Sequence, residues 1–207
     1  MCKLLVCVLV AGALRIASAN AITLEPVLSD PLFQQIINRP CVIGENSCHN
    51  VGFAGPVLLP PNVSSYDTFS LIYTVSDIRA AIGDAFLVGV DINQNNNVQT
   101  VSLFTMLIGS VVQDSYSPDS PTPVPPAPGG NPGNGYADYV LGNFSSLAGL
   151  PETTTVQFHV IMPVVNAGRE QFFLIPAAVE VVPEPVTMSM FGIGLIALAL
   201  AQRRLRK

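Results

Sequence analysis

The chain has 207 residues, of which 49% are apolar and only 11% are charged, and its net charge is −5. Soluble domains usually carry about 25% charged residues. With 9 Lys and Arg against 14 Asp and Glu, the chain is acidic overall, which argues against a nucleic-acid partner, because binding of phosphates requires an excess of clustered Lys and Arg. Its apolar content is too high for a charge-rich disordered chain, and its length permits one ordinary domain with accessory segments.

Residues 1–21 have the pattern of a secretory signal peptide. Lys3 provides a short positive start, and residues 4–14 form an apolar run of eleven. Small residues then offer two cleavage sites, one after Ala19 and one after Ala21. Because eleven residues are too few to span about 30 Å of hydrocarbon, we expect this segment to be removed during export.

After export the chain retains Cys41 and Cys48, since the other two cysteines lie in the signal peptide. In an oxidising compartment this pair is predicted to form a disulfide that closes a short loop. A zinc site built with His49 and His159 is an alternative, although the C-x-x-C spacing typical of zinc and redox sites is absent.

Residues 22–182 have the pattern of an all-β domain. Alternating apolar residues predict strands at 69–75, 101–105 and 156–162, a strand buried on both faces at 85–92, and a final strand at 171–182. Scattered prolines disfavour long helices, and short helical pieces are expected only at 30–38 and 78–82. We predict an antiparallel β-sandwich of about seven strands, and a jelly-roll variant or a β-barrel also fits the pattern.

Residues 118–135 contain seven Pro and four Gly. Such a stretch has little apolar surface to offset the entropy of ordering, so we expect an exposed loop inserted between two strands. A polyproline ligand for a partner's groove is the alternative interpretation.

Asp91, Asn93 and Asn95 follow the D-x-N-x-N spacing of a calcium loop. Asn96 stands where such a loop needs Gly, and Ser102 stands where it needs a bidentate Glu. The three residues are therefore a weak calcium candidate, and an Asn-rich hairpin turn explains the same residues.

No catalytic motif emerges from the sequence, and no cofactor is expected. His159 shares its predicted strand face with Gln157, which favours a surface or rim position. Asp84, Asp91 and Asp138 are the acids to inspect for a secreted hydrolase. The chain has no Trp, so a carbohydrate-binding face would have to use its tyrosines, Tyr66, Tyr73, Tyr116, Tyr136 and Tyr139.

The C-terminal segment combines three signals in a fixed order. Pro183, Glu184 and Pro185 hold the chain extended, and residues 186–202 form an uncharged apolar stretch that is predicted to be a transmembrane helix. The basic tail at 203–207 stays cytoplasmic by the positive-inside rule. Its charged residues are Arg203, Arg204, Arg206 and Lys207.

This arrangement resembles the PEP-CTERM sorting signal of Gram-negative bacteria. The resemblance implies an exosortase as partner, with cleavage near Pro183–Pro185, and an association with exopolysaccharide. We therefore expect a non-enzymatic protein, first held in the inner membrane with its domain in the periplasm, then presented at the cell surface or released into the extracellular matrix. A carbohydrate-binding module and a secreted hydrolase are the competing hypotheses.

Residues 22–182 carry 13 acidic and 3 basic residues, a net charge of −10. This charge argues against binding of an anionic polysaccharide by simple attraction.

Overall fold

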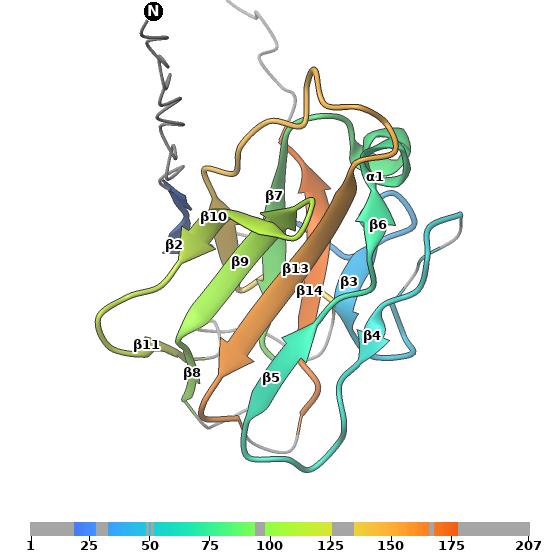
Figure 1. The fold of residues 1–207 in the computed structure, drawn as a ribbon. Coiled ribbons are helices and arrows are strands. Elements are labelled where there is room, and N and C mark those ends of the chain that lie inside the picture. The colour runs from blue at the N-terminus through green and yellow to red at the C-terminus, as the bar shows by residue number, and fades with distance from the viewer. Residues whose placement is uncertain are drawn as a thin grey trace, which may run out of the picture. The chain divides into compact units, whose positions relative to one another are not determined.

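The computed structural model describes residues 19–27, 33–48, 50, 52–93, 98–125, 135–165 and 168–177. Within these ranges the chain forms fourteen strands, several of them only two residues long, and one helix. Most strands belong to two main sheets (Figure 1). The predicted signal peptide up to residue 18 and the predicted transmembrane helix lie outside the described residues.

The first main sheet, sheet A, has the order β1-β10-β9-β13-β5, and β6 also pairs with β13. All its pairs are antiparallel except that of β1 with β10. Its strands are β1 (Asn20–Ala21), β5 (Tyr66–Phe69), β6 (Tyr73–Thr74), β9 (Leu103–Ile108), β10 (Val111–Tyr116) and β13 (Thr155–Met162).

The second main sheet, sheet B, has the order β2-β12-β7-β14-β3-β4, and only β3 and β4 pair in parallel. Its strands are β2 (Thr23–Pro26), β3 (Cys41–Gly44), β4 (Val57–Leu58), β7 (Phe86–Asp91), β12 (Tyr139–Gly142) and β14 (Gln171–Pro176). Two further strands, β8 (Gln99–Val101) and β11 (Thr122–Val124), pair only with each other.

The two sheets share one hydrophobic core. Along β13 every second residue is buried, as period-two alternation predicts, and these residues join a cluster with side chains from sheet B. Phe104 of β9 lies 6.0 Å from Phe158 of β13 and 5.8 Å from Phe172 of β14, measured between ring centroids. In Figure 1, β9 and β13 accordingly form a layer in front of β7 and β14. The prediction of an all-β protein with two main sheets is confirmed, whereas the expected number of about seven strands is too low, because several predicted strands are divided into short pieces.

The strand predicted at 69–75 is interrupted. β5 ends at Phe69, β6 covers only two residues, and Leu71 and Ile72 between them are exposed. Ser70 maintains this break, because its N–H donates to the Phe158 carbonyl and its hydroxyl accepts from the Phe158 N–H. The sequence pattern overlooked the break because a serine hydroxyl can replace a main-chain partner in the ladder.

The only helix in the described residues is α1 (Val75–Ile82), longer than the piece predicted at 78–82. A capping box begins it: the Thr74 hydroxyl accepts from the Asp77 N–H, and the Asp77 carboxylate accepts from the Thr74 N–H. Within the second predicted piece, 30–38, the described residues 33–38 form no helix, and Gln34 makes an isolated bridge to Tyr136.

Three other predicted segments differ in detail. The strand expected at 101–105 is divided at Ser102 between β8 and β9, with Phe104 facing the core. Part of the Pro-rich stretch 118–135 forms β11, whose Val124 is fully buried. Of the final strand predicted at 171–182, the described part ends at Pro176, where the ring removes an N–H donor.

A smaller apolar cluster covers the other face of sheet B. It contains Cys41, Ala137, Phe173 and Ile175, with Phe33 and Val27 packed against it. Gly89 of β7 lies directly beneath Phe173, and a Cβ atom at this glycine would come within 2.6 Å of the ring. The glycine therefore allows Phe173 to lie flat against the sheet.

We predict that Gly89→Ala destabilises the domain by about 1–3 kcal/mol, because the added methyl displaces Phe173. Gly55→Ala is the matched control, since its Cβ would meet nothing within 4 Å. Urea unfolding followed by circular dichroism measures both. Equal stability of the two variants would contradict the close packing at Gly89.

Candidate functional site

Cys41 and Cys48 form a disulfide, as predicted, with their Cα atoms 5.9 Å apart. The bond joins β3 to the turn that follows it and occupies both thiols that the zinc alternative requires. Asn50 supports the loop, because its side chain accepts from the Cys41 N–H and donates to the Cys41 carbonyl. Gln171 of β14 donates to Glu45 inside the loop, so the loop is attached to the centre of sheet B.

We predict that reduction of this disulfide lowers the free energy of unfolding by about 2–3 kcal/mol, the loop-closure value for a loop of this size. Unfolding with and without dithiothreitol measures the loss. Cys48→Ala is the control variant, because its stability should not respond to the reductant. A parent protein that is equally insensitive would show that the bond does not form in solution.

Two buried carboxyl groups lie where β7 ends and β14 begins. Asp91 is 1% exposed and Glu170 is fully buried. Asp91 accepts from the Gly135 N–H through one oxygen, whereas its Oδ2 has no hydrogen-bond partner among the described residues. Glu170 accepts from the Asn93 N–H and from the Gln99 amide, so it bonds the chain on both sides of residues 94–97. Sequence reasoning singled out Asp91 but overlooked Glu170, which no motif marks.

Burial is the main reason why both carboxyl groups hold protons more tightly than usual. It raises the pKa of Asp91 to about 8, with a further contribution from Asp138. It raises the pKa of Glu170 to about 7, although the hydrogen bonds from Gln99 and Asn93 oppose the rise. Near neutral pH, therefore, both groups titrate inside the folded protein.

These shifts predict that the domain loses stability as pH rises. A carboxyl group whose folded pKa exceeds its unfolded value near 4 stabilises the folded state most below pH 4. This stabilisation is lost as pH rises to about 8. We expect the free energy of unfolding to fall by several kcal/mol across this range. Denaturant titrations at successive pH values measure the slope.

Asp91→Asn and Glu170→Gln should each reduce the slope, since the amides do not titrate. Asp119→Asn, at an exposed position, is the matched control and should leave the slope unchanged. A parent profile that is flat between pH 4 and 8 would contradict the buried, protonated state of the two groups.

The calcium candidate is only partly within the described residues. Asp91 pairs across the strands with Gln171, whereas Glu170 lies toward sheet A. Burial, with a further contribution from Glu170, raises the pKa of Tyr66 to about 12. Asn93 uses its N–H on Glu170. No group of three or more His, Cys, Asp or Glu residues in the described part of the chain is arranged to hold a metal ion. Asn95 lies outside that part, so the calcium site stays a prediction.

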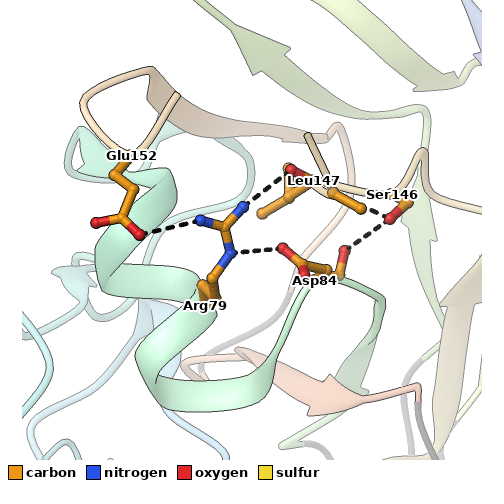
Figure 2. Close-up of polar contacts among 6 residues, drawn as sticks. Arg79, Asp84, Ser146, Leu147 and Glu152 are labelled. Atoms are coloured by element: carbon orange, nitrogen blue, oxygen red, sulfur yellow. Dashed lines mark hydrogen bonds and ion pairs between the residues drawn. The ribbon is translucent and has the colours of Figure 1, made fainter. Parts of the chain in front are cut away.

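Asp84, another acid considered for catalysis, belongs to a structural network (Figure 2). Arg79 of α1 donates from Nε to Asp84 Oδ1 over 2.7 Å, and its other nitrogens reach the Leu147 carbonyl and Glu152. Figure 2 shows the guanidinium at the centre of these partners. The network joins α1 and the turn before β7 to the connection between β12 and β13, which gives Asp84 a stabilising role. Asp138, the third acid, accepts from the Ile92 N–H at the end of β7.

Of the five tyrosines considered for a sugar site, three are buried, whereas Tyr116 and Tyr136 are partly exposed. Tyr66, Tyr73 and Tyr139 are at most 9% exposed. His159, by contrast, lies on the face of β13 opposite the core, where its ring stacks on Phe69 with 3.9 Å between centroids. Its Nε2 is 2.7 Å from Asp67 Oδ1. His159 thus occupies the surface position expected for it, but with an aromatic partner that the sequence pattern did not identify.

The model of the PEP-CTERM protein-sorting motif matches residues 181–204. The chain therefore carries a PEP-CTERM sorting motif, which confirms the resemblance drawn from its residues. This motif implies an exported protein that is sorted and processed by an exosortase, and PEP-CTERM proteins are membrane-anchored or exported proteins of the cell envelope. No match was found among curated proteins or among solved structures. Among the described residues no helix is long and apolar enough to cross a membrane, and the predicted span at 186–202 lies beyond them.

Proposed function

We propose that this chain is a non-enzymatic protein of the cell envelope or extracellular matrix, delivered by sequential processing at its two ends. The match of the sorting motif to residues 181–204 is the observation that carries the proposal. Residues 186–202 anchor the newly exported chain in the inner membrane, with the basic tail in the cytoplasm and the β-domain in the periplasm. Exosortase then cuts near Pro183–Pro185 and releases the domain to the cell surface or the matrix.

The proposed exported unit is a single, mainly antiparallel β-sandwich that begins at β1 and precedes the sorting motif. The ring contact between Phe104 of sheet A and Phe172 of sheet B supports a shared interior. The matched motif begins at residue 181, four positions after Ala177, the last described residue of this unit. A cut near Pro183–Pro185 therefore falls outside every strand that the structure describes.

A non-enzymatic role is supported by where the candidate acids lie. Asp91 is buried where a substrate cannot reach it, and Asp84 is engaged by Arg79. Neither arrangement suits the pair of open carboxyl groups that glycoside hydrolysis uses.

The structure also favours one of the two signal-peptide cleavage sites. Asn20 and Ala21 form β1, which pairs with β10, and Ile22 donates to the Ser115 carbonyl. Cleavage after Ala21 would remove this strand, whereas cleavage after Ala19 retains it. We therefore propose Asn20 as the first residue of the mature protein.

Mass spectrometry of the mature protein from its host tests both ends. We expect an N-terminus at Asn20 and the absence of residues 203–207. Replacement of Pro183, Glu184 and Pro185 by Ala should leave uncut protein in the membrane fraction. Pro121→Ala, at an exposed position of the domain, is the matched control and should be processed normally. If residues 203–207 remain attached to all of the mature protein, the proposed processing is wrong.

A further inference from the structure

The outward side of sheet A combines an exposed aromatic ring with hydrogen-bonding groups in a register row. On β13 the residues that alternate with the buried ones face away from sheet B, and His159 is one of them. Its cross-strand partners are Phe69 on β5 and Thr105 on β9, and Thr105 pairs in turn with Ser115 on β10. Cross-strand partners share a face, so these four residues form one row across the sheet. Thr105 in this row is buried, at 5% exposed, and Phe69 is its exposed end. We call this side the outer face of sheet A.

Phe69 lies at one end of this row in a fixed orientation. Phe69 is 46% exposed, although burial of an aromatic side chain is normally favourable. His159 stacks parallel to it, with 6° between the ring planes, and Asp67 holds the imidazole. Since β5 is the last strand of the sheet, no further strand covers the opposite face of the ring. The stack thus presents one open aromatic face without further ordering.

Asp67 and Gln157 provide hydrogen-bonding atoms on the same face of the sheet as the Phe69 ring. Asp67 is 70% exposed in its side chain and uses only one carboxylate oxygen on His159. Gln157, two residues from His159 on the same face of β13, donates its amide to the Ser70 carbonyl, and its own oxygen remains an acceptor. An apolar face beside groups that bind hydroxyls matches a sugar ring, which has C–H bonds on its faces and hydroxyls at its edge.

The charge on the outer face of sheet A favours a neutral polymer over an anionic one. The three arginines within residues 22–182, Arg39, Arg79 and Arg169, all lie outside the strands of sheet A. A polyanion would therefore meet Asp67 and no arginine or lysine side chain from these strands. A neutral polymer avoids that repulsion.

We propose that the outer face of sheet A binds a neutral polysaccharide, with one sugar ring packed on Phe69 and its hydroxyls bonded to Asp67 and Gln157. Asp67 and Phe69 lie on the edge strand β5, and Gln157 lies on the adjacent strand β13, which suits an extended chain that passes along this edge of the sheet. This inference gives a partner to the proposed matrix role and rests on it. It is nevertheless tested without reference to processing, so either can fail alone.

The test is affinity electrophoresis of the full-length chain, purified in a non-ionic detergent. Gels contain dextran, laminarin, galactomannan or xylan as neutral probes, and alginate as the anionic probe. We expect at least one neutral polysaccharide to retard the protein and alginate not to retard it. Phe69→Ala should weaken binding about tenfold, the loss expected when one ring contact is removed. Phe69→Trp should retain binding, because it keeps the aromatic face.

Leu58→Ala is the matched control, since Leu58 is 49% exposed on β4 of sheet B and should not affect binding. Phe69→Leu separates the ring from apolar bulk: it should keep the parent's thermal stability and lose binding as Phe69→Ala does. No retardation by any neutral probe overturns the proposal, as does equal retardation of the parent and Phe69→Leu. Concentration-dependent dimerisation in sedimentation that Phe69→Ala abolishes would overturn it too, and assign this face to a second copy of the chain.

Discussion

The packing of two β-sheets against each other through their apolar faces determines the rest of this structure. Each sheet has one face rich in large apolar side chains, and these faces can leave water together only by meeting. Phe104, Phe158 and Phe172 occupy the contact, with ring centroids about 6 Å apart across strands and across sheets. Once this core is formed, the outward side of every strand is decided, because side chains alternate along it.

The outer faces of the two sheets differ in how far other segments cover them. The outer face of sheet B is covered by a second apolar cluster around Phe173, and the disulfide loop is attached to the same sheet through Gln171. On the outer face of sheet A, Phe69 is 46% exposed, and the His159 side chain stacked on it is 14% exposed. The difference follows from connectivity: segments 33–40 and 135–138 return over sheet B, where Phe33 and Ala137 join the covering cluster. An asymmetric domain of this kind has one side committed to stability and another free for contact.

The covered side explains the raised pKa of Asp91, and burial on the side toward sheet A explains that of Glu170. Asp91 continues the outward row of β7 beneath this covering, where its charge is poorly solvated, and Glu170 bonds the chain on both sides of residues 94–97. Their raised pKa values are thus a consequence of the fold rather than of a catalytic arrangement. Sorting, in contrast, depends on a linear motif at residues 181–204, which needs no tertiary contact to be recognised.

The sequence by itself determined the features that depend on local order. The PEP-CTERM motif, the Cys41–Cys48 pair and the alternation of 156–162 are each encoded within a few consecutive residues, and all three are confirmed. Only the tertiary structure decided which residues meet across strands. Phe69 stacks on His159, 90 positions away in sequence, and Glu170 bonds to Gln99. The same applies to the break at Ser70, which depends on Phe158. The alternation of apolar and polar residues along a strand indicates the face on which a side chain lies. The neighbours of that side chain and its loss of solvent depend on strand order and register, which are fixed only when the two sheets pack.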